Sequence, residues 1–223
     1  YCAFLAVALE TVAYRPLRGA SRLALLLSAL GMSIFLSNGM MLAQGVYDKA
    51  YPLFFTSGGF EVGGVVVTNM QVFIIIGSVL LMISLNLFVN RTRLGKAMRS
   101  TAQDRVMSAI LGINANKTIV TTFVIGAVLA AAAGVMVGLY YGSVRFDMGF
   151  IPGIKAFSAA VLVGIGNLTG AMLGGMIIGM VEIFAAGYLA SEYKDVFAFI
   201  ILILVLYFRP TGIMGEQVDD TRV

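Results

Sequence analysis

Residues 118–141 read TIVTTFVIGAVLAAAAGVMVGLYY, a run of 24 residues without a charged side chain. A helix of about 20 apolar residues spans the hydrocarbon core of a bilayer, so this run predicts a transmembrane helix. Four further runs, the last of them somewhat short, predict spans at residues 23–42, 72–89, 171–189 and 196–208. These runs indicate that the fold is built from membrane-spanning helices.

The composition of the whole chain agrees with this interpretation. Hydrophobic residues make up 60% of the 223 residues and charged residues 12%, and the mean hydropathy is +0.96. Soluble domains are about 45–50% apolar and about 25% charged, and a soluble fold of this length could not hide the excess. The chain has no histidine and one cysteine. A disulfide framework and a Cys/His zinc site are therefore excluded within this chain, and we expect it to bind no metal and no cofactor.

Two apolar segments are too short to be ordinary spans. Residues 1–9 are apolar and stop at Glu10, which is half a span, so we expect the sequence to begin inside a helix with its N-terminus truncated. Residues 156–165 form an apolar run of ten, followed by GNLTG at 166–170. Such a piece is typical of a broken or re-entrant helix. A full helix from about Gly153, kinked near residue 166, is the alternative.

Basic residues fall unequally on the two sides of these spans. Eleven lie on one side, namely Arg15, Arg18, Arg22, Arg91, Arg93, Lys96, Arg99, Arg105, Lys117, Arg209 and Arg222; four lie on the other, namely Lys49, Arg145, Lys155 and Lys194. The positive-inside rule places the eleven in the cytoplasm. The sides alternate correctly only if residues 156–189 cross in and back out.

We therefore expect an all-α polytopic membrane protein with about six to seven membrane segments, one of them broken or re-entrant. Residues 1–223 form a single transmembrane domain in this interpretation. Residues 43–71 are its external loop, and the β-prone residues 65–68 with neighbouring glycine pairs are compatible with a small external cap.

The basic segment 91–117 is expected on the cytoplasmic side. Apolar residues recur in it at helical spacing, at Ala102, Val106, Ala109, Ile110 and Ile113, which predicts an amphipathic helix along the inner face. Gly112 and Asn114 are suitable helix-stop residues. Two interpretations remain open from the residues alone: contact with anionic lipid headgroups, which needs only charge, and docking of the apolar face in a groove on a cytoplasmic partner.

Several short motifs resemble the permease subunits of ATP-binding-cassette (ABC) importers for branched-chain amino acids. In chain order they are YRPLR at 14–18, TRLGKAMR at 92–99, GIN at 112–114, KAF at 155–157, AAVL at 159–162, GIG at 164–166, GAMLGG at 170–175 and RPTG at 209–212. The resemblance runs in order across nearly the whole chain. It implies a multi-pass protein of the plasma (inner) membrane of a prokaryote, in contact with membrane lipid.

The resemblance also implies partners. A second homologous permease subunit would complete the membrane core, cytoplasmic ATPase subunits would drive it, and a periplasmic or lipoprotein receptor would deliver the solute. The chain itself would be no enzyme, because it has no Gly-x-x-x-x-Gly-Lys-Ser/Thr loop for a nucleotide phosphate. No nucleic acid partner is expected.

The resemblance favours the docking interpretation for residues 91–117, where such permeases place their coupling helix. The residues expected to couple to the ATPase are Ala102, Asp104, Val106, Ala109, Ile110 and Gly112. One departure is that importer permeases often carry a Glu-Ala-Ala signature here, whereas residues 102–104 read AQD. Coupling is therefore predicted from position and amphipathicity.

Candidate residues of the translocation path surround the predicted break. They are Gly164, Gly166, Asn167, Gly170 and Glu182. A non-helical break at the midplane offers backbone donors and acceptors to a zwitterionic solute without fixed charge. The glycine spacing 166, 170 and 174 equally suits tight helix packing in lipid. Glu182 is the one acid inside a predicted span; it either faces a cavity or a partner, or lies near the outer end of its helix.

Alternative functions remain at this stage. Permeases of the same kind serve other small polar solutes such as urea and short amides. An ion- or proton-coupled secondary carrier is the second alternative, although such carriers usually bury several acids or a histidine and only Glu182 is available here. An intramembrane enzyme is disfavoured because the chain has no histidine, no metal-ligand cluster and no paired aspartates within its spans.

Overall fold

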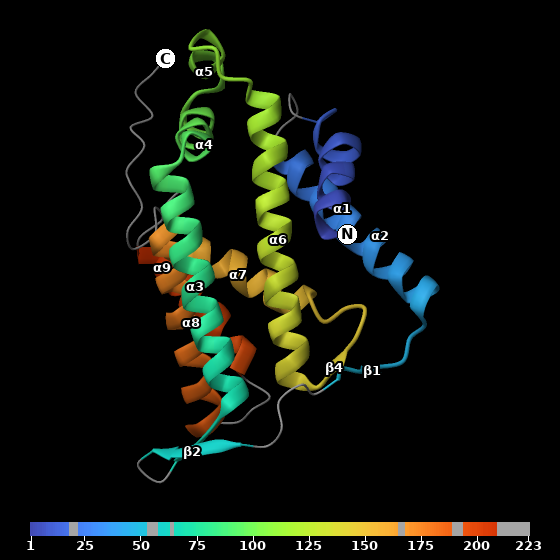
Figure 1. The fold of residues 1–223 in the computed structure, drawn as a ribbon, viewed down its shortest axis with the longest axis vertical. Helices are drawn as coiled ribbons and strands as arrows, with labels where there is room; N and C mark the ends of the chain where they lie inside the picture. The colour runs from blue at the N-terminus through green and yellow to red at the C-terminus, as the bar shows by residue number, and fades with distance from the viewer. Residues whose placement is uncertain (18–21, 53–57, 63–64, 165–167, 189–193, 209–223) are drawn as a thin grey trace. The chain divides into compact units, whose positions relative to one another are not determined.

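A computed structural model describes residues 1–17, 22–52, 58–62, 65–164, 168–188 and 194–208. The chain divides into two compact units, residues 1–147 and residues 148–223. Figure 1 shows both units, with the helices and strands labelled in chain order.

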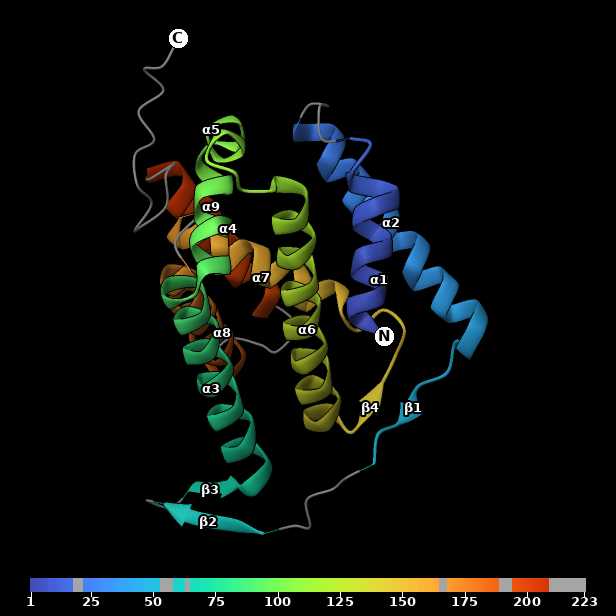
Figure 2. The ribbon, with the colours of Figure 1, turned by 45° about the horizontal axis from the view of Figure 1, so that its top comes forward.

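The first unit is built around one long helix. Its helices are α1 (Cys2–Leu9), the π-helical turn η1 (Glu10–Tyr14), α2 (Arg22–Gln44), α3 (Asn69–Arg91), α4 (Arg93–Gln103), α5 (Arg105–Ile110) and α6 (Ala115–Tyr141). Helices α1, α3, α4 and α5 all contact α6, as can be followed in Figures 1 and 2. The first apolar run ends at Glu10, but the helix continues through η1, and Glu10 is buried.

Short strands join the helices of this unit on the side that the charge distribution predicts to be external. Strand β1 (Lys49–Ala50) pairs antiparallel with β4 (Ser143–Val144). Strands β2 (Gly59–Val62) and β3 (Val65–Thr68) pair antiparallel with Gly59 opposite Thr68, so the β-prone residues 65–68 are a strand (Figure 2). Thr68 then caps α3, with the Gln71 side chain accepting from the Thr68 backbone N–H at 3.1 Å. Residues 69–71, predicted to be loop, are therefore helical.

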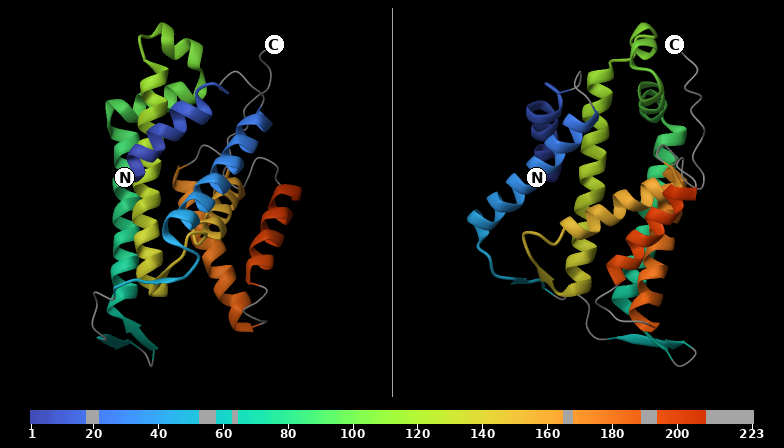
Figure 3. Two further views of the ribbon diagram at one scale, coloured as in Figure 1. Left: turned by 90° about the vertical axis from the view of Figure 1, so that its right-hand side faces the viewer. Right: turned by 180° about the vertical axis from the view of Figure 1, so that it is seen from behind.

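In the second unit, the described residues form the helices α7 (Phe150–Val163), α8 (Leu168–Tyr188) and α9 (Lys194–Phe208). Each of the three contacts the other two (Figure 3). Its core consists of Ala159, Leu162, Val163 and Ile178, against which Val205 of α9 packs.

The predicted fold class is confirmed. Among the described residues, four helices are long and apolar enough to cross a membrane, at Leu27–Gln44, Asn69–Arg91, Ala115–Tyr141 and Leu168–Tyr188. Shorter apolar helices include Cys2–Tyr14, Phe150–Val163 and α9. The helix predicted at residues 156–165 starts earlier, at Phe150, and ends at Val163 instead of continuing as one kinked span.

Candidate functional site

The segment predicted to couple to an ATPase is two helices rather than one. The prediction of a single amphipathic helix through residues 102–113 is wrong, because α4 ends at Gln103 and α5 begins at Arg105. Asp104 lies between them in an extended conformation, with φ −151° and ψ 115°. Its carboxylate accepts hydrogen bonds from the backbone N–H groups of Val106 at 2.8 Å and Met107 at 3.1 Å. Asp104 is thus the N-cap of α5, and a new helix starts where the predicted one would have continued.

The junction of α3 and α4 is close-packed. The Thr92 hydroxyl donates to the Phe88 carbonyl at 2.6 Å and accepts from the Gly95 N–H at 3.0 Å. A Cβ atom placed on Gly95 would lie 2.2 Å from the Val89 carbonyl oxygen. The backbones approach too closely here for any side chain larger than hydrogen.

Helix α5 is held to its neighbours through Ser108. This residue is fully buried, and its hydroxyl lies 2.7 Å from the hydroxyl of Ser100 on α4. After α5 the backbone turns through Gly112, whose φ of +80° favours glycine. Asn114 then caps α6, its side chain accepting from the Lys117 N–H at 3.2 Å.

The opposite side of α5 is apolar and faces solvent. Four side chains have exposed fractions from 57% to 74%, namely Val106, Met107, Ile110 and Leu111. We call these four residues the α5 apolar face. The other predicted coupling residues Ala102, Asp104, Ala109 and Gly112 are also exposed, whereas Ile113 is partly buried. Met107 and Leu111 were missed because the helical phase was carried across Asp104; the aspartate preceding an apolar run was the available N-cap signal.

Two of the predicted path residues, Gly164 and Gly170, lie where α7 ends and α8 begins, whereas Glu182 lies near the other end of α8. Gly164 is buried and ends α7 with φ +122° and ψ 125°. Gly166 and Asn167 lie outside the described residues. Gly170 is buried in the first turn of α8. At 14 residues, α7 is about 21 Å long, which is shorter than the hydrocarbon core of a bilayer.

Helices α7 and α8 pack closely through a small residue. A Cβ atom on Gly174 would lie 2.4 Å from the Ala159 carbonyl oxygen and 2.8 Å from a methyl group of Val163. Substituents on Gly134, Gly175 and Gly179 would meet no atom of the described chain within 4 Å. Close helix packing therefore applies to Gly174, whereas Gly134, Gly175 and Gly179 have free space beside them in the described chain.

Glu182 of α8 forms an ion pair with Lys155 of α7. Its Oε1 atom lies 2.8 Å from the Lys155 Nζ, and each side chain is 19% exposed. The sequence suggested a role for Glu182 but did not assign one to Lys155. The missing signal was the pairing of two single charges on neighbouring apolar helices, which only the antiparallel arrangement of α7 and α8 supplies.

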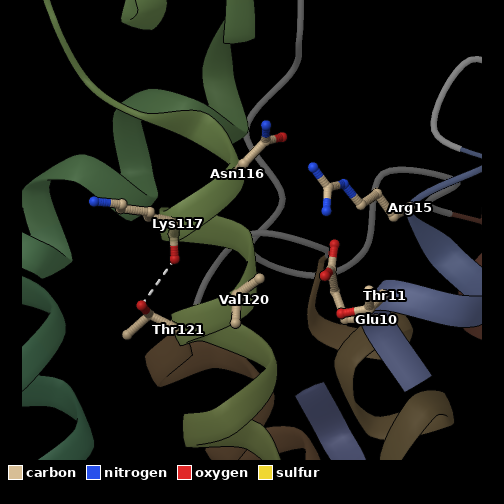
Figure 4. A pocket seen from close by; sticks show the side chains of 7 residues that line it. All are labelled: Glu10, Thr11, Arg15, Asn116, Lys117, Val120 and Thr121. Carbon is tan, nitrogen blue, oxygen red and sulfur yellow. Dashed lines mark hydrogen bonds between the residues drawn. The ribbon is translucent and has the colours of Figure 1, made fainter. Parts of the chain in front are cut away.

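A cleft of about 360 Å³ lies between η1 and the first turns of α6. It is lined by Glu10, Thr11, Arg15, Asn116, Lys117, Val120 and Thr121. Figure 4 shows the Glu10 and Arg15 side chains on the same wall, while the Lys117 side chain points away. The sequence did not predict this cleft. The π-helical turn that forms its wall is a local irregularity that helical periodicity does not encode.

An exposed ion pair follows β4 on the predicted external side. The Arg145 guanidinium donates hydrogen bonds to both carboxylate oxygens of Asp147, one of them at 2.5 Å. This hydrogen bonding holds the pKa of Asp147 below its ordinary value. It also raises the pKa of Arg145.

The described part of the chain contains no cluster of three or more His, Cys, Asp or Glu residues that could hold a metal ion.

Comparison with known proteins covers almost the whole chain. Residues 3–206 match the family "Branched-chain amino acid transport system / permease component". The chain is 52% identical over 212 residues to the high-affinity branched-chain amino acid transport system permease protein BraD of Pseudomonas aeruginosa, covering 93% of this chain and 69% of BraD. It is 48% identical over 213 residues to the corresponding permease LivH of Escherichia coli K12, with the same coverage.

A more distant relative is the fructose import permease FrcC of Rhizobium meliloti, 25% identical over 153 residues, or 66% of this chain and 41% of FrcC. No solved structure matches the chain. The resemblance carried by the short motifs is confirmed by the family match and by the two high-identity relatives. The chain belongs to the family of permease components of branched-chain amino acid transport systems.

Proposed function

We propose that this chain is the membrane permease subunit of an ABC importer and forms the translocation path for branched-chain amino acids. The observation that carries the proposal is the family match over residues 3–206. The chain is a multi-pass protein of the inner membrane, and its long apolar helices suit a permeation role.

The α5 apolar face is the proposed docking site for a cytoplasmic ATPase subunit. Three exposed apolar side chains on a helix of six residues, with a fourth at its C-cap Leu111, would be costly in water without a partner. Burial of Ser108 and capping by Asp104 fix the direction in which this face points. Arg105 is the first residue of α5, so a groove with apolar walls and an acidic edge is the complementary surface. ATP hydrolysis would occur in that separate subunit.

The remaining partners follow from the same assignment. A second homologous permease would complete the membrane core, and a periplasmic or lipoprotein receptor would deliver the solute to the external segment 43–71. The turn after Gly164 is proposed to line the path. A helix that ends within the membrane offers free backbone carbonyl groups there, and these suit the ammonium end of an amino acid.

The decisive experiment is reconstitution of the full-length permease with its ATPase and receptor subunits in liposomes. We expect uptake of leucine, isoleucine and valine to require ATP and receptor, and to be insensitive to collapse of ion gradients. Uptake that needs an ion gradient but no ATP would overturn the ABC assignment. Uptake of urea or acetamide without uptake of leucine would overturn the substrate class.

A further inference from the structure

The ion pair between Lys155 and Glu182 lies between two otherwise uncharged helices. Lys155 is the one charged residue in the sequence of α7, and Glu182 is the one in α8. Each side chain is four-fifths buried, and the Nζ to Oε1 distance is 2.8 Å. Among the described residues, Oε1 of Glu182 accepts no hydrogen bond although it is shielded from solvent. At this distance the pair is held by the attraction between its opposite charges.

The position of the pair is set by the antiparallel helices. Lys155 lies about 8 Å along the axis from the first residue of α7, and Glu182 lies about 9 Å from the last residue of α8. The distribution of basic residues predicts that both of these helix ends are on the external side. The pair therefore lies just inside the outer end of the two helices, with Gly164 at the opposite end of α7.

We propose that Lys155 and Glu182 form a binding station for zwitterionic amino acids on the outer side of the path. The inference rests on the proposed function and adds the residues that recognise the substrate's charged ends. Before an amino acid binds, the opposite charges of the two side chains neutralise each other. When an amino acid arrives, its α-carboxylate binds Lys155 and its α-ammonium binds Glu182.

Charge balance makes this exchange feasible in an apolar environment. An isolated charge between membrane helices is costly, and breaking a buried pair by removing one partner leaves such a charge. A zwitterion replaces both partners at once, so the site is neutral before and after binding. No net charge is buried at any stage.

The same balance gives selectivity. Urea, short amides and sugars have no separated charges, so they cannot compensate Lys155 and Glu182 when the pair opens. A solute with one charge compensates only one side chain. The station therefore selects for zwitterions in general, whereas the aliphatic side chain must be recognised elsewhere.

The test removes both charges together. In the reconstituted complex, the double variant Lys155→Gln with Glu182→Gln is expected to take up leucine at least tenfold more slowly than the natural protein. If the ion pair merely joined the two helices, its replacement by two neutral residues would not slow leucine uptake, because buried ion pairs are often exchanged for neutral residues at little cost in stability. Detergent-solubilised thermal unfolding and the amount of bound ATPase should be unchanged.

The matched control is the exposed pair outside the spans, Arg145→Gln with Asp147→Asn, which should leave uptake unchanged. Unimpaired leucine uptake by the Lys155/Glu182 double variant would overturn the inference. The proposed function fails separately, if the natural protein itself takes up no branched-chain amino acid.

A second measurement needs no variant. Modification of Glu182 by a hydrophobic carbodiimide, followed by mass spectrometry on the purified natural complex, reports whether the carboxylate is covered. Leucine should slow the modification several-fold, and acetamide at the same concentration should not. Equal rates of Glu182 modification with and without leucine would overturn the proposed binding station. This test does not depend on whether the double variant assembles.

Discussion

Asp104 has a structural role that its position in the predicted coupling surface did not suggest. Its carboxylate satisfies two backbone N–H groups at the start of α5, and it separates α4 from α5. A direct contact with the ATPase would depend on its charge, whereas a cap depends on its hydrogen-bond acceptor. These two roles are separable by substitution.

We predict that Asp104→Asn keeps most of the ATPase association, because asparagine caps a helix about as well as aspartate. Asp104→Ala should lose the cap, which costs about 1 kcal/mol, and should weaken association several-fold. Co-purification of the ATPase with each variant measures the effect. Equal loss in both variants would indicate that the charge itself contacts the partner.

A second residue-scale prediction concerns acid titration of Asp147. Its pKa is lowered by the hydrogen bonds from Arg145, so the ion pair is intact above the ordinary carboxyl value of 3.8. The stabilisation from this pair is therefore lost only as the pH falls through the lowered pKa. In Arg145→Gln the Asp147 titration, followed by carboxyl-carbon NMR, should move up toward 3.8. An unchanged midpoint would mean that Arg145 is not the cause.

At the scale of single residues, the sequence indicated which residues were unusual but did not show which other residues they contact. Glu182 was noticeable because an acid inside an apolar run is costly. Its partner Lys155 lies 27 positions away, and only the packing of α7 on α8 brings them together. The cleft containing Glu10 was missed for the same reason, since its two walls come from η1 and α6.

At the scale of elements, the α5 apolar face is the feature most open to test. Ile110 is 74% exposed, so Ile110→Asp should leave the fold intact while placing an unpaired charge in the proposed ATPase groove. ATPase co-purification and uptake should both fall at least tenfold, and membrane insertion should stay normal.

The control is Gln103→Asp, which adds the same charge at an exposed position outside the α5 apolar face. If segment 91–117 only anchors to lipid, the double variant Arg99→Gln with Arg105→Gln should do as much harm as Ile110→Asp, since each basic residue contributes about 1 kcal/mol at an anionic surface. Intact association in Ile110→Asp would contradict docking through α5.

The packing of α7 on α8 offers a pair of adjacent glycines for comparison. Gly174→Ala would force a methyl group to within 2.4 Å of a backbone oxygen, and overpacking of this kind costs about 1–3 kcal/mol. Gly175→Ala meets no atom within 4 Å and should stabilise the helix by up to about 1 kcal/mol. Thermal unfolding in detergent distinguishes them, and similar shifts for both would contradict the packing.

The elements themselves were largely predictable. Long apolar runs, interrupted by a charge only at Glu182, correspond to α2, α3, α6 and α8, because a spanning helix must satisfy its backbone internally and present apolar side chains to lipid. Strand β3 also followed from its valines. The division of the segment after α3 did not, because a cap at Asp104 competes locally with a continuous apolar periodicity, and the pattern alone does not show which prevails.

For the whole molecule, the distribution of basic residues predicts which side each loop faces. Tyr47 is 90% exposed in the segment predicted to be external, and Gln103 is exposed in the segment predicted to be cytoplasmic. After Cys2→Ser, a cysteine at Tyr47 should react with an impermeant thiol reagent in intact cells, and a cysteine at Gln103 only after permeabilisation. The opposite pattern would invert the topology.

Gly95 makes the joint between α3 and α4 a stiff one. The backbones of the two helices are closely packed at Gly95, and the Thr92 hydroxyl donates to α3 and accepts from α4. The joint therefore allows almost no movement of one helix relative to the other. We therefore expect a displacement of α5 to be passed through the Ser100–Ser108 contact to α4 and from α4 to α3. Because α4 and α3 are joined stiffly, a displacement of a few ångströms at α5 is expected to reappear as a movement of α3.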